Sequence, residues 1–195
     1  MKPQTEKLSE PDMRFFTREL YTQFNSLDED LANRADEAWE AAIQAYHGHL
    51  ESLREQMPDQ VRKLAKLCLH DAEVLAQKLV IEPVAALPIE PLGPGPLWSA
   101  VCILSVEQDG KVLSLIYSLW DHVREYEPQG NWPFSKLRKH WLYDEVDVAA
   151  GSPRLFLHRV LFSDGKITEI PFMSVIMNSV SLPAPRGAKK SRKTA

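Results

Sequence analysis

A proline-rich stretch in the middle of the chain constrains the fold most. Residues 82–97, EPVAALPIEPLGPGPL, contain five of the fourteen prolines in the sequence. Proline removes a backbone donor and fixes φ, so this stretch cannot be helical and is poor material for a central strand. We therefore expect a stiff connector that separates a helical N-terminal part from a strand-rich C-terminal part.

The residues before the connector follow the period of an α-helix. From residue 31 to residue 57 the apolar positions recur at steps of three and four, which predicts one long helix. Pro58 ends this helix and can begin a second one, whose apolar positions repeat the same spacing. We expect an antiparallel helical hairpin over residues 28–81, preceded by a leader and lead-in over residues 1–27.

After the connector the apolar pattern changes to that of strands. Asp-Gly pairs at 109–110 and 164–165 are each flanked by apolar runs, and such pairs predict hairpin turns. The segment LRKHWLYDEVDV, residues 137–148, adds a strand before the second hairpin, so that residues 98–182 supply five strands. We expect one α+β domain in which the helical hairpin packs on a mostly antiparallel five-stranded sheet.

The stretch HWLYDEVDV, residues 140–148, has a histidine and three acids among its apolar strand residues. If Asp164-Gly165 is a two-residue turn, and if Val148 pairs with Arg154 across the preceding loop, two acids and two histidines share one face of the sheet. A slip of one residue in that loop would separate them. The four residues are His140, Asp144, His158 and Glu169.

This cluster has two interpretations, because a buried acid must be paired or hydrogen-bonded. We expect a structural polar cluster in which hydrogen bonds or the His158 imidazole hold Asp144. The alternative is the catalytic or metal-binding site of a small hydrolase. No residue spacing matches a metal-ligand motif, and we expect neither a metal nor a cofactor.

The two cysteines offer little chemistry. Cys68 and Cys102 each fall in an apolar run, and we expect both to be small buried hydrophobes in a reducing compartment. His49 lies on the apolar side of the first predicted helix and would come near Cys68 in antiparallel packing. A Cys–His pair can form a nucleophile, but a core histidine beside a buried thiol is the preferred interpretation.

The distribution of charge argues against a nucleic-acid-binding body. The tail at residues 183–195 holds five basic residues and no acid, which leaves 18 basic against 27 acidic residues elsewhere, a net charge of −9. Phosphate backbones require Lys and Arg. We expect the tail to be disordered and solubilising, with a weak contact to nucleic acid or to an anionic surface as the alternative.

The N-terminus and the hydropathy indicate a soluble cytoplasmic protein. No segment reaches the roughly 18 apolar residues that a bilayer span requires, and no signal peptide precedes the helical part. The residues from Met13 onward, MRFFTRELY, are more typical of the start of a folded chain than those from Met1. We therefore expect residues 1–12 to be either a flexible leader or a misassigned start.

Four fragments, MRFFTRELY, LHDAEVL, WLYDEVD and LFSDGKITEIPF, together resemble an uncharacterised bacterial family, a domain of unknown function. The resemblance spans residues 13–177. It implies a cytoplasmic bacterial protein, and it supplies no activity and no functional residues.

The sequence favours a non-catalytic module that recognises another protein, as immunity and adaptor proteins of this size and class do. Its binding surface would be the sheet face or the loop around Asn131-Trp132-Pro133. The alternative remains the small hydrolase or metal-binding enzyme. The candidate binding residues are Trp132, Trp141, Tyr143 and Arg159.

Overall fold

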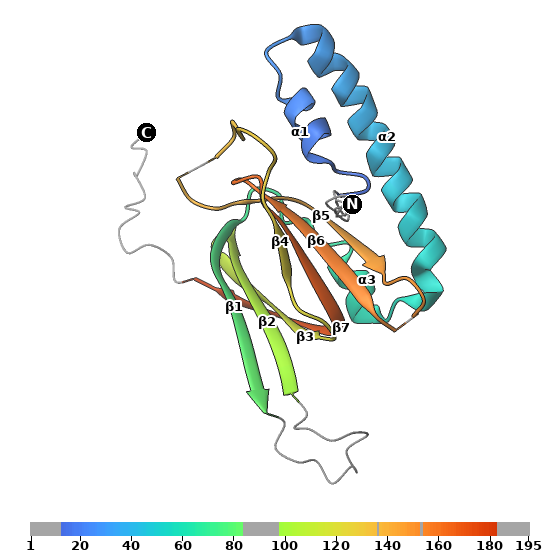
Figure 1. Cartoon of the computed structure of the whole chain (residues 1–195), viewed down its shortest axis with the longest axis vertical. Coiled ribbons are helices and arrows are strands. Elements are labelled where there is room, and N and C mark those ends of the chain that lie inside the picture. Colours follow the sequence, from blue (N-terminus) through green and yellow to red (C-terminus); the bar gives the residue numbers. More distant parts are fainter. Residues whose placement is uncertain (1–12, 84–97, 136, 153, 183–195) are drawn as a thin grey trace, which may run out of the picture.

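The computed structural model describes residues 13–83, 98–135, 137–152 and 154–182. In these residues the helices come first and the strands follow (Figure 1). The helices are α1 (Arg18–Phe24), α2 (Glu29–Leu53), the 3-10 turn η1 (Arg54–Gln56) and α3 (Asp59–Leu64). The strands are β1 (Glu73–Pro83), β2 (Trp98–Gln108), β3 (Lys111–Leu119), β4 (Arg124–Tyr126), β5 (Trp141–Val148), β6 (Phe156–Phe162) and β7 (Ile167–Ser181).

The long helix predicted from the sequence is confirmed as α2. Asp28 caps its start by accepting a hydrogen bond from the backbone N–H of Leu31 at 3.1 Å, and two more acids occupy the first turn, where the helix dipole favours them. The helix ends at Leu53, and η1 carries the chain to Pro58, the N-cap of α3. The short α1 lies alongside α2 (Figure 1).

The predicted second helix is wrong beyond Leu64, and with it the helical hairpin. Asp71 adopts a left-handed conformation with φ 63°, and its backbone N–H donates to the carbonyl of Trp141 at 2.9 Å. The chain then continues as β1, in which Leu75 and Leu79 are 48% and 53% exposed. A short apolar run fits the period of a helix and that of a strand. The pairing with β2 therefore decides that this segment is a strand.

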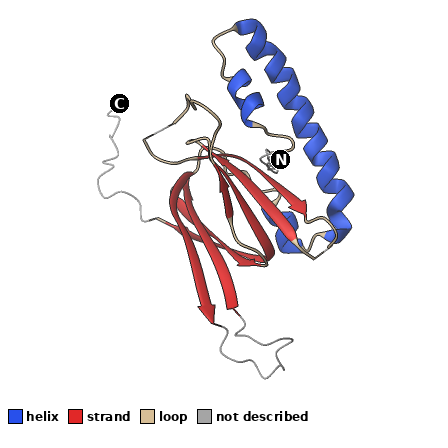
Figure 2. Cartoon of the chain, in the orientation of Figure 1, coloured by secondary structure: helices blue, strands red, loops and turns tan. Residues whose placement is uncertain are grey.

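All strand pairs are antiparallel, in the order β1-β2-β3-β7-β6-β5, and β4 also pairs with β7. The sheet curls into a half-barrel (Figure 2). Its two outer strands meet at one end, where Val74 N–H donates to the carbonyl of Lys139 (2.8 Å) and Trp141 N–H donates to that of Ala72 (2.9 Å). The five strands expected from the sequence are therefore too few, because β1 and β4 were missed.

Apolar residues are buried on both faces of the sheet at β5 and β6. The core inside the half-barrel includes Tyr117, Trp141 and Phe172 and is capped by residues of α3 such as Val61. A second core lies on the outer face, under α1 and α2, and it is built from Leu142, Leu161, Ile167, Met13, Phe16, Trp39 and Tyr46. This double burial explains why β5 departs from a clean alternation of polar and apolar residues.

The first predicted hairpin has the expected turn, with Gln108 opposite Lys111. The second hairpin is off by one residue, because its loop has three residues and ends in Gly165 with φ 80°. A two-residue turn would place Glu169 opposite Val160, but in the structure Glu169 pairs with Arg159.

Between β5 and β6 the predicted register is wrong by two residues. Val146 pairs with His158, and Asp144 pairs with Val160. A shift of two leaves each side chain on its face, so Asp144 and His158 still lie on the same side of the sheet.

The other regions expected from the sequence lie mostly outside the described residues. Of the connector predicted at 82–97, the structure describes only residues 82 and 83, which are the end of β1. The described chain resumes at Trp98, the first residue of β2. Residues 1–12 and the basic tail at 183–195 are outside it. Within the described residues, no helix combines the length and the apolar character that crossing a bilayer requires.

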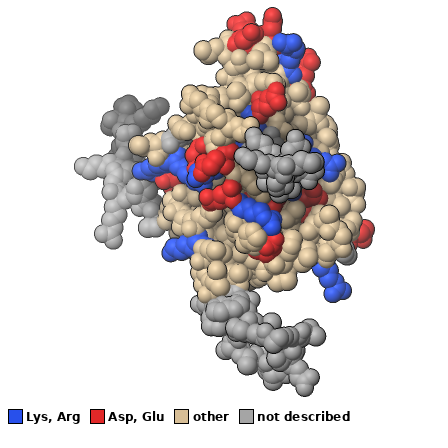
Figure 3. Space-filling model, viewed as in Figure 1, with Lys and Arg blue, Asp and Glu red and all other residues tan. Residues whose placement is uncertain are grey.

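Charged side chains of both signs are interspersed on the face of the molecule in Figure 3, between larger uncharged areas.

Candidate functional site

An open cleft of about 650 Å³ lies between α2, the segment after α3 and the first half of β5. Its volume is in the range of small-molecule sites. Most of its walls are apolar, and the principal contributors are Trp39, Ile43, Leu50, Met57, Leu67 and Leu142.

Each of the two walls of the cleft is attached to β5 by its own hydrogen bond. On one side, the Tyr46 hydroxyl of α2 accepts from the N–H of Val146 at 2.7 Å. On the other side, Nδ1 of His70 donates to the carbonyl of Leu142 at 2.8 Å. Tyr143 fills the floor between them, with its ring 4.3 Å from that of Trp39 and 4.9 Å from that of His70.

Asp144 is the carboxylate at the floor of the cleft. Its Oδ1 accepts from Nε1 of Trp141 at 2.9 Å, and its Oδ2 lies 3.1 Å from Nε2 of His158. The Asp144 side chain is 14% exposed, whereas His158 is fully buried. The carboxylate therefore receives two contacts from the core while one edge remains on the cleft.

Behind His158 stands Tyr117, whose hydroxyl lies 2.8 Å from Nδ1 of the imidazole. Burial, and then the charge of Asp144, raise the pKa of Tyr117 well above its ordinary value, so the phenol keeps its proton. The neutral phenol can donate to Nδ1, and a proton on Nε2 then lies toward Asp144. The result is a chain of hydrogen bonds from Tyr117 through His158 to Asp144.

Basic side chains stand at the rim of the cleft. Arg54 pairs with Glu51 at 3.0 Å, and Arg62 pairs with Asp59 next to it. Lys66 also lines the cleft and has no ion-pair partner among the described residues.

The four catalytic candidates divide into two groups. The structure confirms that Asp144 and His158 are neighbours, as predicted. Glu169 lies on the outer face, where it binds Arg159 at 2.8 Å and Arg124 at 3.0 Å. His140 precedes β5, and its Nδ1 donates to the carbonyl of Arg138 at 2.8 Å. The one-residue error in the predicted second hairpin explains why Glu169 lies on the other face of the sheet from Asp144 and His158.

On the same outer face, Glu145 anchors the start of the described chain. Its carboxylate accepts from the N–H groups of Arg14 (2.9 Å), Phe15 (2.6 Å) and Phe16 (2.8 Å). Burial raises the pKa of Glu145 above its ordinary value, and these hydrogen bonds and the charge of Arg159 oppose the shift. No feature of the local sequence predicts this contact.

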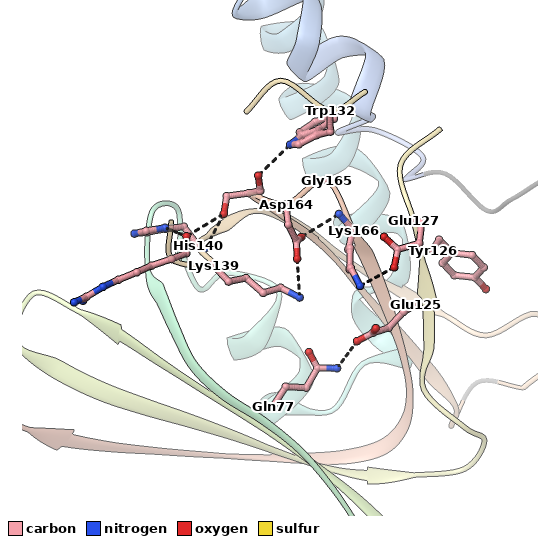
Figure 4. A network of polar contacts seen from close by, with 12 residues as sticks. Gln77, Glu125, Tyr126, Glu127, Trp132, Lys139, His140, Asp164, Gly165 and Lys166 are labelled. Carbon is pink, nitrogen blue, oxygen red and sulfur yellow. Dashed lines mark hydrogen bonds and ion pairs between the residues drawn. The ribbon is translucent and has the colours of Figure 1, made fainter. Parts of the chain in front are cut away.

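The candidate binding loop around Trp132 is turned inward, onto the second hairpin (Figure 4). Nε1 of Trp132 donates to the carbonyl of Ser163 at 3.0 Å, and its ring covers Gly165 so closely that an added Cβ would lie 2.6 Å from Cδ2. The Ser163 hydroxyl in turn accepts from the N–H of His140 at 2.9 Å. Trp132 and His140 thus fix the turn, and the glycine is required there both for its φ and for space.

Of the other binding candidates, Trp141 is fully buried and Arg159 is paired with Glu169, which leaves Tyr143 as a cleft residue.

The two cysteines differ in exposure. Cys102 is buried as expected, but Cys68 is exposed on the cleft, which corrects the expected burial.

Antiparallel packing of two helices would bring His49 near Cys68, but the structure does not pair these two residues. It instead lies 3.0 Å from Asp147 of β5.

In the described part of the chain, no cluster of three or more His, Cys, Asp or Glu side chains is arranged to hold a metal ion. Comparison of the chain with models of protein families, with curated proteins and with solved structures found no match.

Proposed function

We propose that the protein binds a small apolar organic molecule in the cleft between α2 and β5. The observation that carries this proposal is an open volume of about 650 Å³ with apolar walls and one hydrogen-bonded carboxylate at its floor. Sites for small molecules have this composition, in which apolar walls supply affinity and a few polar groups supply orientation.

The anchoring of the walls supports a cleft that exists before the ligand arrives. Tyr46 ties α2 to β5, and His70 ties the opposite wall to the same strand. A ligand then does not have to order these segments, and a preorganised site binds more tightly for the same contacts.

Recognition of another protein, which the sequence favours, is the less supported function. Two of its four expected binding residues, Trp132 and Trp141, make their contacts inside the molecule. The cleft is therefore favoured over the Trp132 loop as the place where a ligand binds.

The exposed thiol on the cleft provides the test. With 1-octanol as the probe, we expect saturable binding by isothermal titration calorimetry and slower alkylation of Cys68 by N-ethylmaleimide, since the bound chain would cover the thiol. Octanol without effect on either measurement would contradict the proposal.

Two tryptophan substitutions sharpen the test. Ala65 is half-buried on the cleft, so Ala65→Trp should fill the cleft and abolish both effects. Val180→Trp adds the same ring at a position on β7 that is 66% exposed and away from the cleft, and it should leave octanol binding unchanged. Equal binding by both variants would show that octanol binds elsewhere.

A further inference from the structure

We propose that Asp144 is the recognition group of the cleft and that its ligand is an apolar molecule bearing a protonated amine. This inference rests on the proposed function, since it requires that a small molecule occupies the cleft. It goes further by naming the chemical class and the residue that selects it.

The first step concerns the hydrogen bonds that Asp144 already makes. Nε2 of His158 lies 3.1 Å from one oxygen of Asp144, and the indole N–H of Trp141 donates to the other oxygen at 2.9 Å. The indole N–H can only donate, and Nε2 donates to the carboxylate when it carries the proton. Two fixed donors suit an ionised carboxylate, which accepts only, and they leave acceptor capacity toward the cleft.

The second step concerns charge. No lysine or arginine of the described chain pairs with Asp144, and its neighbour His158 is fully buried. A carboxylate that is mostly buried without a lysine or arginine partner is an unfavourable arrangement, and a hydrogen bond to a charged group is worth more than one between neutral groups. A ligand ammonium in the cleft would place a positive charge beside this carboxylate.

The third step separates the floor of the cleft from its rim. Arg54 and Arg62 are engaged by Glu51 and Asp59, and Lys66 stands at the rim as an unpaired cation within the described residues. An anionic ligand group would therefore favour the rim and be repelled by Asp144. A cationic group would favour the floor, where the Asp144 carboxylate borders the cleft.

The position of Tyr46 is consistent with this selection. Burial, and then the charge of Asp144, raise the pKa of Tyr46 above its ordinary value, so this cleft residue stays neutral. Asp144 is then the anion of the cleft floor.

Three ligands with the same chain and different head groups test the inference: 1-octylamine, 1-octanol and octanoate, titrated calorimetrically at pH 7, where an alkylamine is protonated. We expect octylamine to bind about tenfold more tightly than octanol, as expected for a hydrogen bond to a charged group, and octanoate to bind most weakly. Asp144→Asn should remove the advantage of octylamine and keep octanol binding.

A second carboxylate on β5 is the matched control. Asp147 pairs with His49 outside the cleft, and Asp147→Asn should leave the preference for octylamine intact. Since the three-ligand comparison uses the wild-type protein, it decides the question even where Asp144→Asn fails to fold.

The outcomes distinguish the two proposals. Equal affinity for octylamine and octanol would overturn the role of Asp144 and leave the cleft as a binding site. Tightest binding of octanoate would overturn it in favour of the rim cations. Failure of all three ligands to bind would overturn the proposed function itself.

Discussion

The two faces of the β5–β6 pair carry similar residues in different settings. On the inner face, Asp144 meets His158 and borders the cleft. One residue further along, on the outer face, Glu145 lies opposite Arg159. Both acids are half-buried or buried, and both have a basic residue on the neighbouring strand.

The two acids differ in what surrounds them. Glu145 accepts from three consecutive backbone N–H groups and sits beside Arg159, so its contacts are with the protein on every side. Asp144 has two donors behind it and the cleft in front. The comparison teaches that an acid in a strand indicates structure or function according to the space next to it, and that residue type alone does not distinguish the two.

Removal of Glu145, the acid on the outer face, should have the largest effect on stability. Glu145→Ala leaves three N–H groups without their acceptor, and we expect a loss of about 2–4 kcal/mol in the free energy of unfolding. Urea denaturation measures it. Glu127→Ala, which removes an exposed partner of Lys166, is the control and should change little. A negligible effect of Glu145→Ala would mean that residues 14–16 do not depend on this carboxylate.

Removal of Asp144, the acid on the inner face, should lower the free energy of unfolding by less. Asp144→Ala leaves the N–H groups of His158 and Trp141 unpaired, but the cleft admits water to the site, so we expect a loss on the order of 1–3 kcal/mol. Asp144→Asn preserves the shape and should cost less than Asp144→Ala by the same measurement. If Asp144→Ala were as destabilising as Glu145→Ala, the contrast between the two faces would fail.

The pH dependence of stability should expose the buried state of Glu145. Because burial raises its folded pKa above the ordinary 4.5, its contribution is fully present below pH 4.5 and is lost as the pH rises through the folded pKa. The stability difference between the wild type and Glu145→Gln should therefore decrease as the pH rises from 4.5. Urea titrations of both proteins at several pH values would show this, and a difference that grows with pH would contradict it.

The cysteines extend the comparison without affecting stability. Burial raises the pKa of Cys102 to about 11, and its side chain is enclosed, whereas Cys68 is exposed on the cleft. At pH 8 we expect one equivalent of N-ethylmaleimide to react quickly at Cys68, and Cys102 to react only after unfolding. Peptide mass spectrometry identifies the modified residue, and rapid labelling of Cys102 would show that the half-barrel opens readily.

The parts of the fold that local chemistry determines were predictable. The start of α2 follows from the acids at 28–30, and the β2–β3 hairpin follows from Asp109-Gly110. The neighbourhood of Asp144 and His158 was also predicted, although the register was wrong, because an error of two residues preserves the face. The one-residue error beyond Ser163 moved Glu169 to the other face.

The remaining features depend on contacts between distant segments. The run EVLAQKLVIEP fits both a helix and a strand, and only its pairing with β2 makes it β1. Tyr117 reaches His158 because β3 pairs with β7 and β7 with β6, a sheet order that no local signal specifies. The cleft requires the docking of α2 on β5 and was therefore not predictable.

The contact between Glu145 and residues 14–16 has a consequence for the synthesis of the protein. The N–H groups that the carboxylate binds belong to residues about 130 positions earlier in the chain, which leave the ribosome first. At typical elongation rates roughly ten seconds separate the two segments. During that interval Met13 and Phe16 have no core to join, and the nascent chain presents them to solvent and to chaperones until β5 is made.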